Sequence, residues 1–514
     1  MTETRHAGCA LTAIPWIRTA AGPMTVRDAL LTAHDSDGLD SRLNGIQTGA
    51  QLRYLTAVTA LVLRHQGRPG KAFSAEAVDQ ALALITPHSN VLDPDRPFLQ
   101  IPAGNTPPKA GKEFPVKKLL PWMPADRAEE FWSDGAHPEQ LDGADAVLAL
   151  AVHHHYSFGG NNKIEGRSCA NGSPGIRYPG VGYTATEVLW QGGNLFETLL
   201  LNTPKSWVDG TGLPAWADPS CKVSGNGAGK PEHPLWRATW GSNTAMCAWD
   251  GTTLTAVTTG GSTHRPPTMG EGKVAAKAWW DTRNTEDTFY LYVDIERKTA
   301  KGVVQSVERK AQRLDFGHSP TDLAVEWNSK NLSSVVQSRS KQMVRTPDDE
   351  QIMFLRHLVE GSASSPVVRR TEVLVSSPKK WIIDEDRADA VSFASQLVKA
   401  VCSEVCRPFT DPLRGSNPLN HSLRTLKDRR PDVETAFWQK VAKPFEQFIV
   451  SGTGDSIDPA VWPAVRTAAL AAFDEVTSSA PASKLAPFVM TARNRVAWNI
   501  TQALGLAPQK AGTK

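Results

Sequence analysis

Apolar residues recur at helical spacing near the start of the chain and again near its end. Between residues 51 and 65 they fall at Leu52, Leu55, Val58, Ala60 and Leu63, which predicts a helix there. Two further helices are expected after Thr25 and after Ser74, because a hydroxyl side chain in front of a periodic apolar run is typical of an N-cap. The N-terminal region is therefore expected to be largely helical, after a short strand over residues 11–18.

The middle of the chain has a different pattern. Prolines interrupt residues 87–122, so this stretch is expected to thread over the surface as a connection. A short helix or a buried apolar run is expected over residues 144–155, and a helix over residues 192–201. Strand-like stretches joined by loops rich in Gly, Ser and Thr then predict strands near residues 253–258, 288–295 and 371–375.

The last part of the chain contains four amphipathic segments separated by breakers rich in Gly, Pro and Ser. They cover residues 384–408, 432–450, 459–478 and 482–505. Short connections between helices of this length favour an antiparallel four-helix bundle. The predicted fold class is therefore α+β: a large mixed N-terminal domain with irregular loops over residues 1–378, and a C-terminal antiparallel four-helix bundle over residues 379–514.

Composition narrows the classes of function. The 514 residues include 56 basic and 53 acidic side chains, a formal net charge of +3, which is too even for a globally basic nucleic-acid-binding surface. Any site for a polyanion is therefore expected to be a local groove. The six cysteines are scattered without a CxxC pair, and neither a signal-peptide pattern nor an apolar run of membrane-spanning length is present. These features favour a cytoplasmic protein with reduced thiols and no membrane association.

Three consecutive histidines, His153 to His155, suggest a metal site. On a strand only two of them would share a face, and on a helix they would fan out by about 100° each, so they converge on one ion only with distant ligands. The HExxH, GxSxG and GxxxxGK[ST] motifs are absent. The sequence therefore predicts no metal and no cofactor. A cytoplasmic metal-dependent hydrolase that uses these histidines stays open as an alternative.

The stretch after the histidines is rich in glycine. Residues 159–182 hold seven glycines, with Lys163, Arg167 and Arg177 between them. Glycine lets backbone amides approach a partner closely, and interleaved cations suit a phosphate-bearing partner. This stretch is a candidate nucleic-acid contact, and a flexible surface loop is the alternative.

A second candidate contact is the long loop that follows Lys117 and Lys118. It carries Phe131 and Trp132 in polar surroundings. Aromatic side chains on such loops stack on unpaired bases or wedge a duplex. Burial of the same rings in the protein is an equal alternative.

Several phrases occur in an order and spacing that resemble one protein family. They are IPWI followed by TVRDALLTAH, LDPDRPFLQ, FPVKKLLPW, the FGG stretch, NLFETLLLNTP and LPAWAD. Together with the C-terminal helices, they make the chain similar over essentially its full length to the CasA family, the large subunit of the type I-E CRISPR surveillance complex Cascade.

The resemblance implies a recognition subunit without catalytic activity, in antiviral defence. The family recognises the protospacer-adjacent motif (PAM) on double-stranded target DNA from the minor groove, helps to open the duplex for R-loop formation, and docks the helicase-nuclease. Sequence specificity is left to guide pairing. The implied partners are the other Cascade subunits, the 5′ handle of the guide RNA, double-stranded target DNA and the helicase-nuclease. A scaffold that only bridges protein subunits stays open as an alternative.

The resemblance also implies three sets of contact residues. The glycine loop that faces the minor groove falls on Phe158, Gly159, Gly160 and Asn161. The loop that reaches the guide handle and the DNA includes Arg127, Phe131 and Trp132. The strand-separating wedge falls on Ser362, Ala363, Ser364 and Ser365, where small residues argue against steric wedging by side chains.

Two sets of cations complete the predicted interface. The candidates for the groove-contacting lysine of the family are Lys273, Lys277 and Arg283. A basic patch in front of a C-terminal helix consists of Arg424, Lys427, Arg429 and Arg430. This patch is expected either to contact DNA or to be a solvated interhelical loop.

Overall fold

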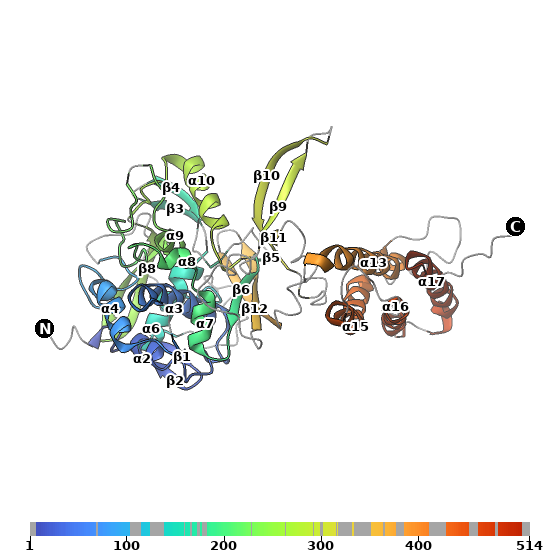
Figure 1. The fold of residues 1–514 in the computed structure, drawn as a ribbon, viewed down its shortest axis with the longest axis horizontal. Helices are drawn as coiled ribbons and strands as arrows, with labels where there is room; N and C mark the ends of the chain where they lie inside the picture. The colour runs from blue at the N-terminus through green and yellow to red at the C-terminus, as the bar shows by residue number, and fades with distance from the viewer. Residues whose placement is uncertain are drawn as a thin grey trace. The chain divides into compact units, whose positions relative to one another are not determined.

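The chain divides into two compact units in its computed structural model (Figure 1). The first consists of residues 1–313 and 333–375, and the second of residues 314–332 and 376–514. The structure describes residues 7–67, 70–102, 115–123, 138–158, 160–164, 167–171, 175–176, 182–227, 229–262, 264–290, 292–298, 302–314, 316, 332–333, 351–362, 365–376, 385–410, 428–451, 461–478 and 482–505. The boundary at residue 378, and the recognition role assigned to the residues before it, stay predictions.

One long helix, α3, lies buried at the centre of the first unit. The helices of this unit are α2 (Val26–Leu31), α3 (Gly45–Gln66), α4 (Ala75–Ile85), α6 (Gly143–Tyr156), α7 (Leu195–Asn202), α8 (Lys205–Val208), α9 (Pro234–Thr239) and α10 (Gly272–Thr285), with two short 3-10 helices, η1 (Thr86–His88) and η2 (Val116–Leu119). Helix α3 packs against α4, α6, α7 and α8. All its residues from Gly49 to Leu63 are buried, as is typical of a helix covered on every side.

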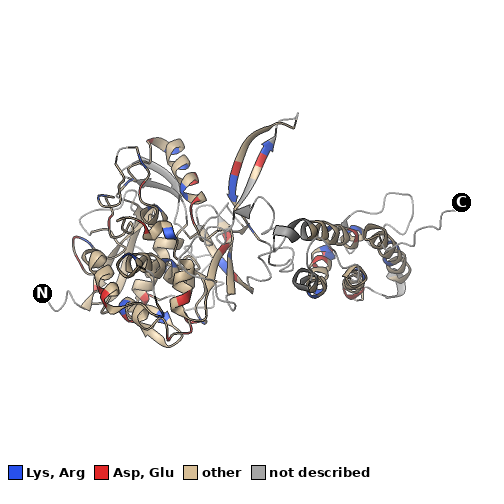
Figure 2. Ribbon diagram, viewed as in Figure 1, with Lys and Arg blue, Asp and Glu red and all other residues tan. Residues whose placement is uncertain are grey.

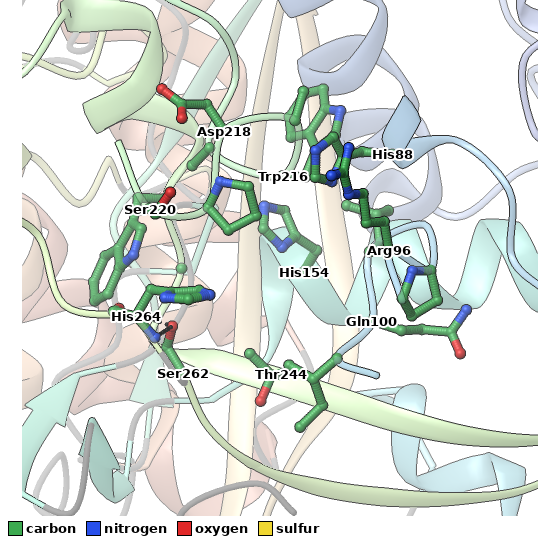
Figure 3. Close-up of a pocket in the computed structure, with 18 of the residues that line it drawn as sticks. His88, Arg96, Gln100, His154, Trp216, Asp218, Ser220, Thr244, Ser262 and His264 are labelled. Atoms are coloured by element: carbon green, nitrogen blue, oxygen red, sulfur yellow. Dashed lines mark hydrogen bonds between the residues drawn. The ribbon is translucent and has the colours of Figure 1, made fainter. Parts of the chain in front are cut away.

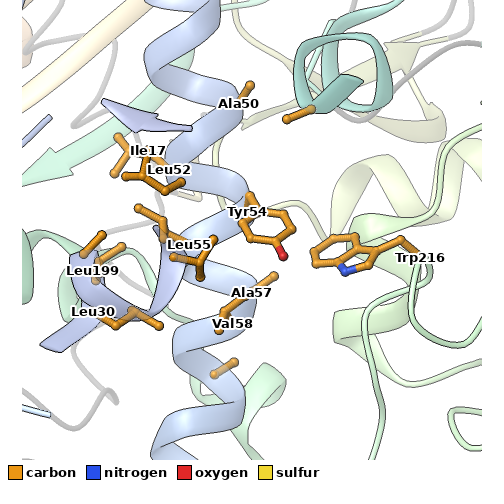
Figure 4. Close-up of a cluster of buried hydrophobic side chains, with 14 of the residues drawn as sticks. Ile17, Leu30, Ala50, Leu52, Tyr54, Leu55, Ala57, Val58, Leu199 and Trp216 are labelled. Atoms are coloured by element: carbon orange, nitrogen blue, oxygen red, sulfur yellow. The ribbon is translucent and has the colours of Figure 1, made fainter. Parts of the chain in front are cut away.

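Helix α3 begins at a capping box and connects two parts of the core. The Asn44 side chain accepts a hydrogen bond from the backbone N–H of Gln47, whose side chain in turn accepts from the N–H of Asn44. Figure 4 shows Leu52 and Leu55 of α3 on the same side as the apolar residues Ile17, Leu30 and Leu199. On its other side Tyr54 stacks on Trp216, with ring centroids 5.0 Å apart. The helix thus joins the N-terminal elements to the segment around Trp216.

Most of the helices expected from the sequence are confirmed. The side chains of Thr25 and Ser74 cap α2 and α4 as predicted, accepting hydrogen bonds from the backbone N–H groups of Asp28 and Ala77. Residues 51–65 lie inside α3, which begins earlier, at Gly45. The apolar run over residues 144–155 is helical, as α6, and α7 overlaps the helix predicted over residues 192–201 but ends one residue later, at Asn202.

The strand expected over residues 11–18 is wrong for most of its length. Strand β1 covers only Ile17–Thr19 and pairs with β2 (Gly22–Met24). The backbone N–H groups of Ala13 and Ile14 both donate to the carbonyl oxygen of Cys9, which closes a turn. Because these local hydrogen bonds satisfy the backbone, the preceding residues do not extend into a strand.

The strands of the first unit form small separate sheets. Strand β3 (Gly160–Ile164) pairs with β4 (Arg167–Asn171), β7 (Asn243–Asp250) pairs with β8 (Thr253–Gly261), and β9 (Tyr292–Lys298) lies between β10 (Val304–Ala311) and β11 (Leu332–Ser333). Strand β12 (Gln351–Ser362) has the equally long β13 (Ser365–Ser376) on one side and β5 (Gly182–Tyr183) and β6 (Glu187–Gln191) on the other. The strands predicted near residues 253, 288 and 371 correspond to β8, β9 and β13.

A buried ion network ties the sheet that contains β6 to the central helix. The guanidinium of Arg53, on α3, contacts the carboxylate of Glu187, on β6, and lies 3.4 Å from that of Asp287. The Tyr156 hydroxyl donates a hydrogen bond of 2.6 Å to the same Glu187 carboxylate. Burial raises the pKa of Glu187 above its ordinary value, although Arg53 opposes the shift. Opposite charges from α3 and β6 therefore compensate each other away from solvent.

The second unit contains a bundle of four helices. They are α13 (Glu385–Thr410), α15 (Arg430–Ser451), α16 (Val461–Thr477) and α17 (Ala482–Ala503). Helices α16 and α17 run antiparallel, because Arg493 binds Asp474 near the end of α16 while Arg466 near its start donates to Thr501. The predicted α+β fold with a C-terminal helical bundle is confirmed. Among the residues described, no helix is long and apolar enough to cross a membrane.

Candidate nucleic-acid interface

Part of the glycine-rich stretch forms a β-hairpin that follows helix α6. Its strands β3 and β4 pair from Gly160 with Asn171 to Ile164 with Arg167. Gly160 and Asn161 therefore lie at the base of the hairpin, in a strand rather than in a turn, while Gly159 lies outside the described residues. A loop was expected here because glycine is rare in strands, so the pairing of β3 with β4 was not predicted.

The residues that lead into this hairpin, Ser157 and Phe158, are held by one amide side chain on β7. The Asn243 amide group donates to the Ser157 hydroxyl at 2.6 Å and to the Phe158 carbonyl oxygen at 2.9 Å. The Phe158 ring is partly buried and packs against the main core. Among the predicted contact residues, Phe158 thus packs against the protein core. Sequence analysis missed Asn243, because nothing in its local pattern marks it.

Helix α10 packs against β4 and brings cations beside the hairpin. Figure 2 shows basic positions along α10, whereas basic and acidic positions are interspersed over much of the drawn chain. The side chains of Lys273 and Lys277 are exposed, and Lys277 forms an ion pair of 2.5 Å with Asp281 on the next turn. An exposed pair of this kind contributes little to stability and opens readily. The helical spacing of the buried Ala276, Trp279 and Trp280 is a signal that could have predicted α10.

The structure does not support Arg283 as a groove cation. Its side chain is only 1% exposed. The guanidinium donates to the carbonyl oxygens of Arg237 and Ala238 and lies 3.6 Å from the Asp287 carboxylate. Arg283 faces inward because it is at the helical spacing of the buried residues of α10. Lys273 and Lys277 stay candidates.

The predicted wedge lies at the end of a long hairpin. Strand β12 ends at Ser362 and β13 begins at Ser365, and Ala363 and Ser364 lie outside the described residues. Near the end of the hairpin, Arg369 of β13 forms an ion pair of 3.2 Å with Glu360 of β12. The stem that carries the predicted wedge is therefore an ordered pair of strands.

The other predicted contacts are only partly described. Arg127, Phe131 and Trp132 lie outside the described residues, as do Arg424 and Lys427 of the basic patch. Arg429 forms an ion pair of 2.8 Å with Asp432, three residues further along, and Arg430 is the first residue of α15. The role of this patch stays a prediction.

The three histidines form the last turn of α6 and are neutral. Burial lowers the pKa of His153 and of His154 to about 4, and lowers that of His155 well below its ordinary value. The His154 ring hydrogen-bonds the Thr239 carbonyl oxygen at 2.8 Å, and the rings of His154 and His155 pack edge to face. The described residues contain no group of three or more His, Cys, Asp or Glu side chains placed to hold a metal ion.

Comparison with known proteins identifies a family. No curated protein sequence matches the chain significantly. Over 99% of its length the fold resembles Thermobifida fusca Cse1, with a TM-score of 0.68, 15% identity and 100% of that chain covered. It resembles Thermus thermophilus CasA over 97% of its length and 99% of that chain, with a TM-score of 0.62 and 17% identity.

A third similar structure is a chain of a CRISPR RNA-guided surveillance complex. It has a TM-score of 0.64 and 19% identity, and the match covers 96% of this chain and 99% of that one. At these identities the likeness establishes the fold. The sequence model of the family described as CRISPR-associated protein Cse1 matches residues 11–479. Because this match spans most of the sequence, the chain belongs to the Cse1 family, also called CasA, as its sequence resemblance predicted.

Proposed function

We propose that the chain is the large subunit of an RNA-guided surveillance complex and recognises the PAM on double-stranded DNA from the minor groove. One observation carries this proposal: Asn243 holds Ser157 and Phe158, which lead into the glycine-bearing hairpin of β3 and β4, and this hairpin packs against a helix with two exposed lysines. The minor groove presents mainly acceptors, so the backbone N–H groups of such a strand suit it. Lysines at its side suit the flanking phosphates.

The proposed subunit has no catalytic step of its own and needs no cofactor. It would help to open the duplex for R-loop formation, contact the other Cascade subunits and the 5′ handle of the guide RNA, and dock the helicase-nuclease. A nearly even charge supports this role, because a subunit inside a ribonucleoprotein needs neutral protein-facing surfaces and only local cationic grooves. The complex would act in the cytoplasm in antiviral defence.

The alternative function, a metal-dependent hydrolase, rested on the histidine triplet. In the structure the three rings lie on successive positions of α6 and are packed among protein groups, with His154 bonded to a backbone carbonyl. No observation in the described residues favours hydrolysis over recognition.

The proposed function is tested by assembling the chain with its partner subunits and a guide RNA. Target duplexes randomised at the positions next to the guide-matched segment are then selected for binding. We expect enrichment of a short motif that depends on the presence of this chain. Equal enrichment without the chain, or binding that is indifferent to the randomised positions, would contradict PAM recognition.

The two lysines of α10 give a second test. We expect the double variant Lys273→Ala/Lys277→Ala to weaken duplex binding about equally for all PAM sequences, because phosphate contacts carry no sequence information. The slope of log K against log salt should fall by about one for each lysine that contacts a phosphate. The exposed Lys205, on α8, supplies the control Lys205→Ala, which should leave the slope unchanged. An unchanged slope in the double variant would show that the lysines of α10 do not contact DNA phosphates.

A further inference from the structure

A cavity of about 490 Å³ lies in the first unit. Its lining includes residues 95–97, 99–102, 215–220 and 222–223, the start of β7, Ser262 and His264 just after β8, and His154 of α6. Figure 3 shows Arg96 and His88 on one side, Ser220 and His264 on the other, and the His154 ring between them. The volume falls within the range of about 300–1,000 Å³ in which proteins bind small organic ligands.

Two sequence phrases that play no part in the proposed interface meet at this cavity. LDPDRPFLQ supplies Asp95 and Arg96, and LPAWAD supplies Trp216 and Asp218. The phrases are far apart in the sequence, and the fold brings both of them to this cavity. Because these polar and aromatic side chains line a cavity, they are candidates to bind a small ligand.

The cavity has a rigid aromatic wall. The Trp216 side chain is 7% exposed, and one face is held by stacking on Tyr54. Trp240, which also lines the cavity, stacks on Trp236 with ring centroids 6.4 Å apart. Side chains that are already packed lose little entropy when a ligand binds. The small parts of the two rings that line the cavity are apolar and suit van der Waals contact with a planar ring.

Beside this wall lies an acceptor without a partner. The Nε2 atom of His154 is 2.8 Å from the Thr239 carbonyl oxygen, and because a carbonyl only accepts, Nε2 carries the proton. Since the ring is neutral, with its pKa lowered to about 4 by burial, Nδ1 is left as an acceptor. In the described part of the chain Nδ1 has no hydrogen-bond partner. A ring with an amino donor is its natural complement.

Cations stand at the mouth of the cavity. Arg96 and Lys222 are exposed, and neither forms an ion pair within the described residues. Two carboxylates also line the cavity. That of Asp218 already accepts the backbone N–H groups of Lys222, Val223 and Ser224 at 2.8 to 3.0 Å, which leaves Asp95 as the single exposed one. Arg96 and Lys222 are therefore suited to bind an anion, and the guanidinium of Arg96 suits phosphate in particular.

We propose that this cavity binds an unstacked nucleotide. Its base lies against Trp216 and donates an amino hydrogen to Nδ1 of His154, and its 5′-phosphate lies between Arg96 and Lys222. The nucleotide is either free in solution or an unpaired residue of a strand. This assignment goes beyond PAM recognition, since it concerns a separate site and a single nucleotide.

The test is calorimetric titration of the full-length chain with CMP, UMP and inorganic phosphate. CMP and UMP differ in the amino group that would face His154, so CMP is expected to bind about tenfold more tightly than UMP, and phosphate more weakly than either. The double variant Arg96→Ala/Lys222→Ala should lose about tenfold in affinity for CMP. The exposed Lys71 lies outside the cavity, and its variant Lys71→Ala should match the unaltered chain.

A cytidine trinucleotide separates the two sources. Affinity equal to that of CMP indicates a free nucleotide, and clearly tighter binding that is lost in the double variant indicates a strand. The proposal is overturned if neither CMP nor the trinucleotide binds, if UMP or phosphate binds as well as CMP, or if the double variant binds normally. No duplex or partner subunit enters this experiment, so its failure leaves PAM recognition untouched, and a failure of PAM recognition leaves this result standing.

Discussion

The complex that carries Gly160→Leu is expected to bind PAM-containing duplexes 10- to 100-fold more weakly, a loss of roughly 1.4–2.8 kcal/mol. Gly160 opens β3 at the base of the hairpin, opposite Asn171. If this backbone lies against the floor of the minor groove, a four-carbon side chain holds it away from the base edges and removes its hydrogen bonds. The measurement is duplex affinity of the assembled complex, with and without a favourable PAM.

Gly70→Leu is the matched control for this variant. An added Cβ at Gly70 meets no heavy atom within 4 Å, so the same substitution there should leave both affinity and assembly unchanged. Guide RNA content and subunit stoichiometry of both complexes show whether the Gly160 variant still assembles. Normal affinity and normal PAM discrimination in a properly assembled Gly160→Leu complex would contradict the proposal that the hairpin contacts the minor groove.

The second large effect concerns stability. Arg53→Met removes the guanidinium that compensates Glu187 and Asp287, both of which are almost completely buried. Breaking a buried pair by removing one partner costs about 3–5 kcal/mol, because the remaining charge is left without compensation. We therefore expect a large drop in the denaturant midpoint of the first unit. Arg42→Met is the control, since Arg42 is 87% exposed in its pair with Asp40 and should change stability by less than about 1 kcal/mol.

The loss in Arg53→Met should depend on pH. The folded-state pKa of Glu187 is already raised above its ordinary value of 4.5 by burial, and loss of the cation raises it further. When the pKa of a carboxyl is higher in the folded than in the unfolded state, the free energy of unfolding falls as the pH rises between the two pKa values. The loss of stability in Arg53→Met should therefore grow as the pH rises from 4.5 through the folded-state pKa of Glu187. A defect that is equally large at about pH 5 and about pH 8 would show that packing, and not the uncompensated charge, is responsible.

Local signals in the sequence were enough for many of the helices. Thr25 and Ser74 act through hydrogen bonds three residues away, so the chain itself contains the whole cap. The bundle helices carry their apolar spacing within each segment. The strand that was wrongly predicted before Ile17 shows the limit of such signals. A short apolar run with a proline fits a turn as well as a strand, and the spacing of its residues does not reveal the hydrogen bonds that close the turn.

The site was less accessible to sequence analysis. Gly160 and Lys273 lie far apart in the sequence, and their elements become neighbours only through the packing of α10 against β4. In the sequence, Arg283 is as good a candidate for the groove cation as Lys273 and Lys277. Its burial on the inner face of α10 argues against that role. The cavity depends in the same way on two remote segments meeting. These pairings are set by tertiary contacts, for which local pattern carries no information.

The placement of β12 bears on how the protein folds while it is being synthesised. Its residues Gln351 to Leu355 pair with β6, whose Glu187 closes the ion network on Arg53 of α3. The core around α3 therefore lacks its closing strand until the ribosome has passed Ser362, and domains are completed only when all their strands have emerged. The bundle, by contrast, uses helices that follow one another and can form quickly from local contacts. While the segment between β6 and β12 is being synthesised, the core around α3 therefore exposes apolar surface and an unpaired strand edge that the complete fold covers.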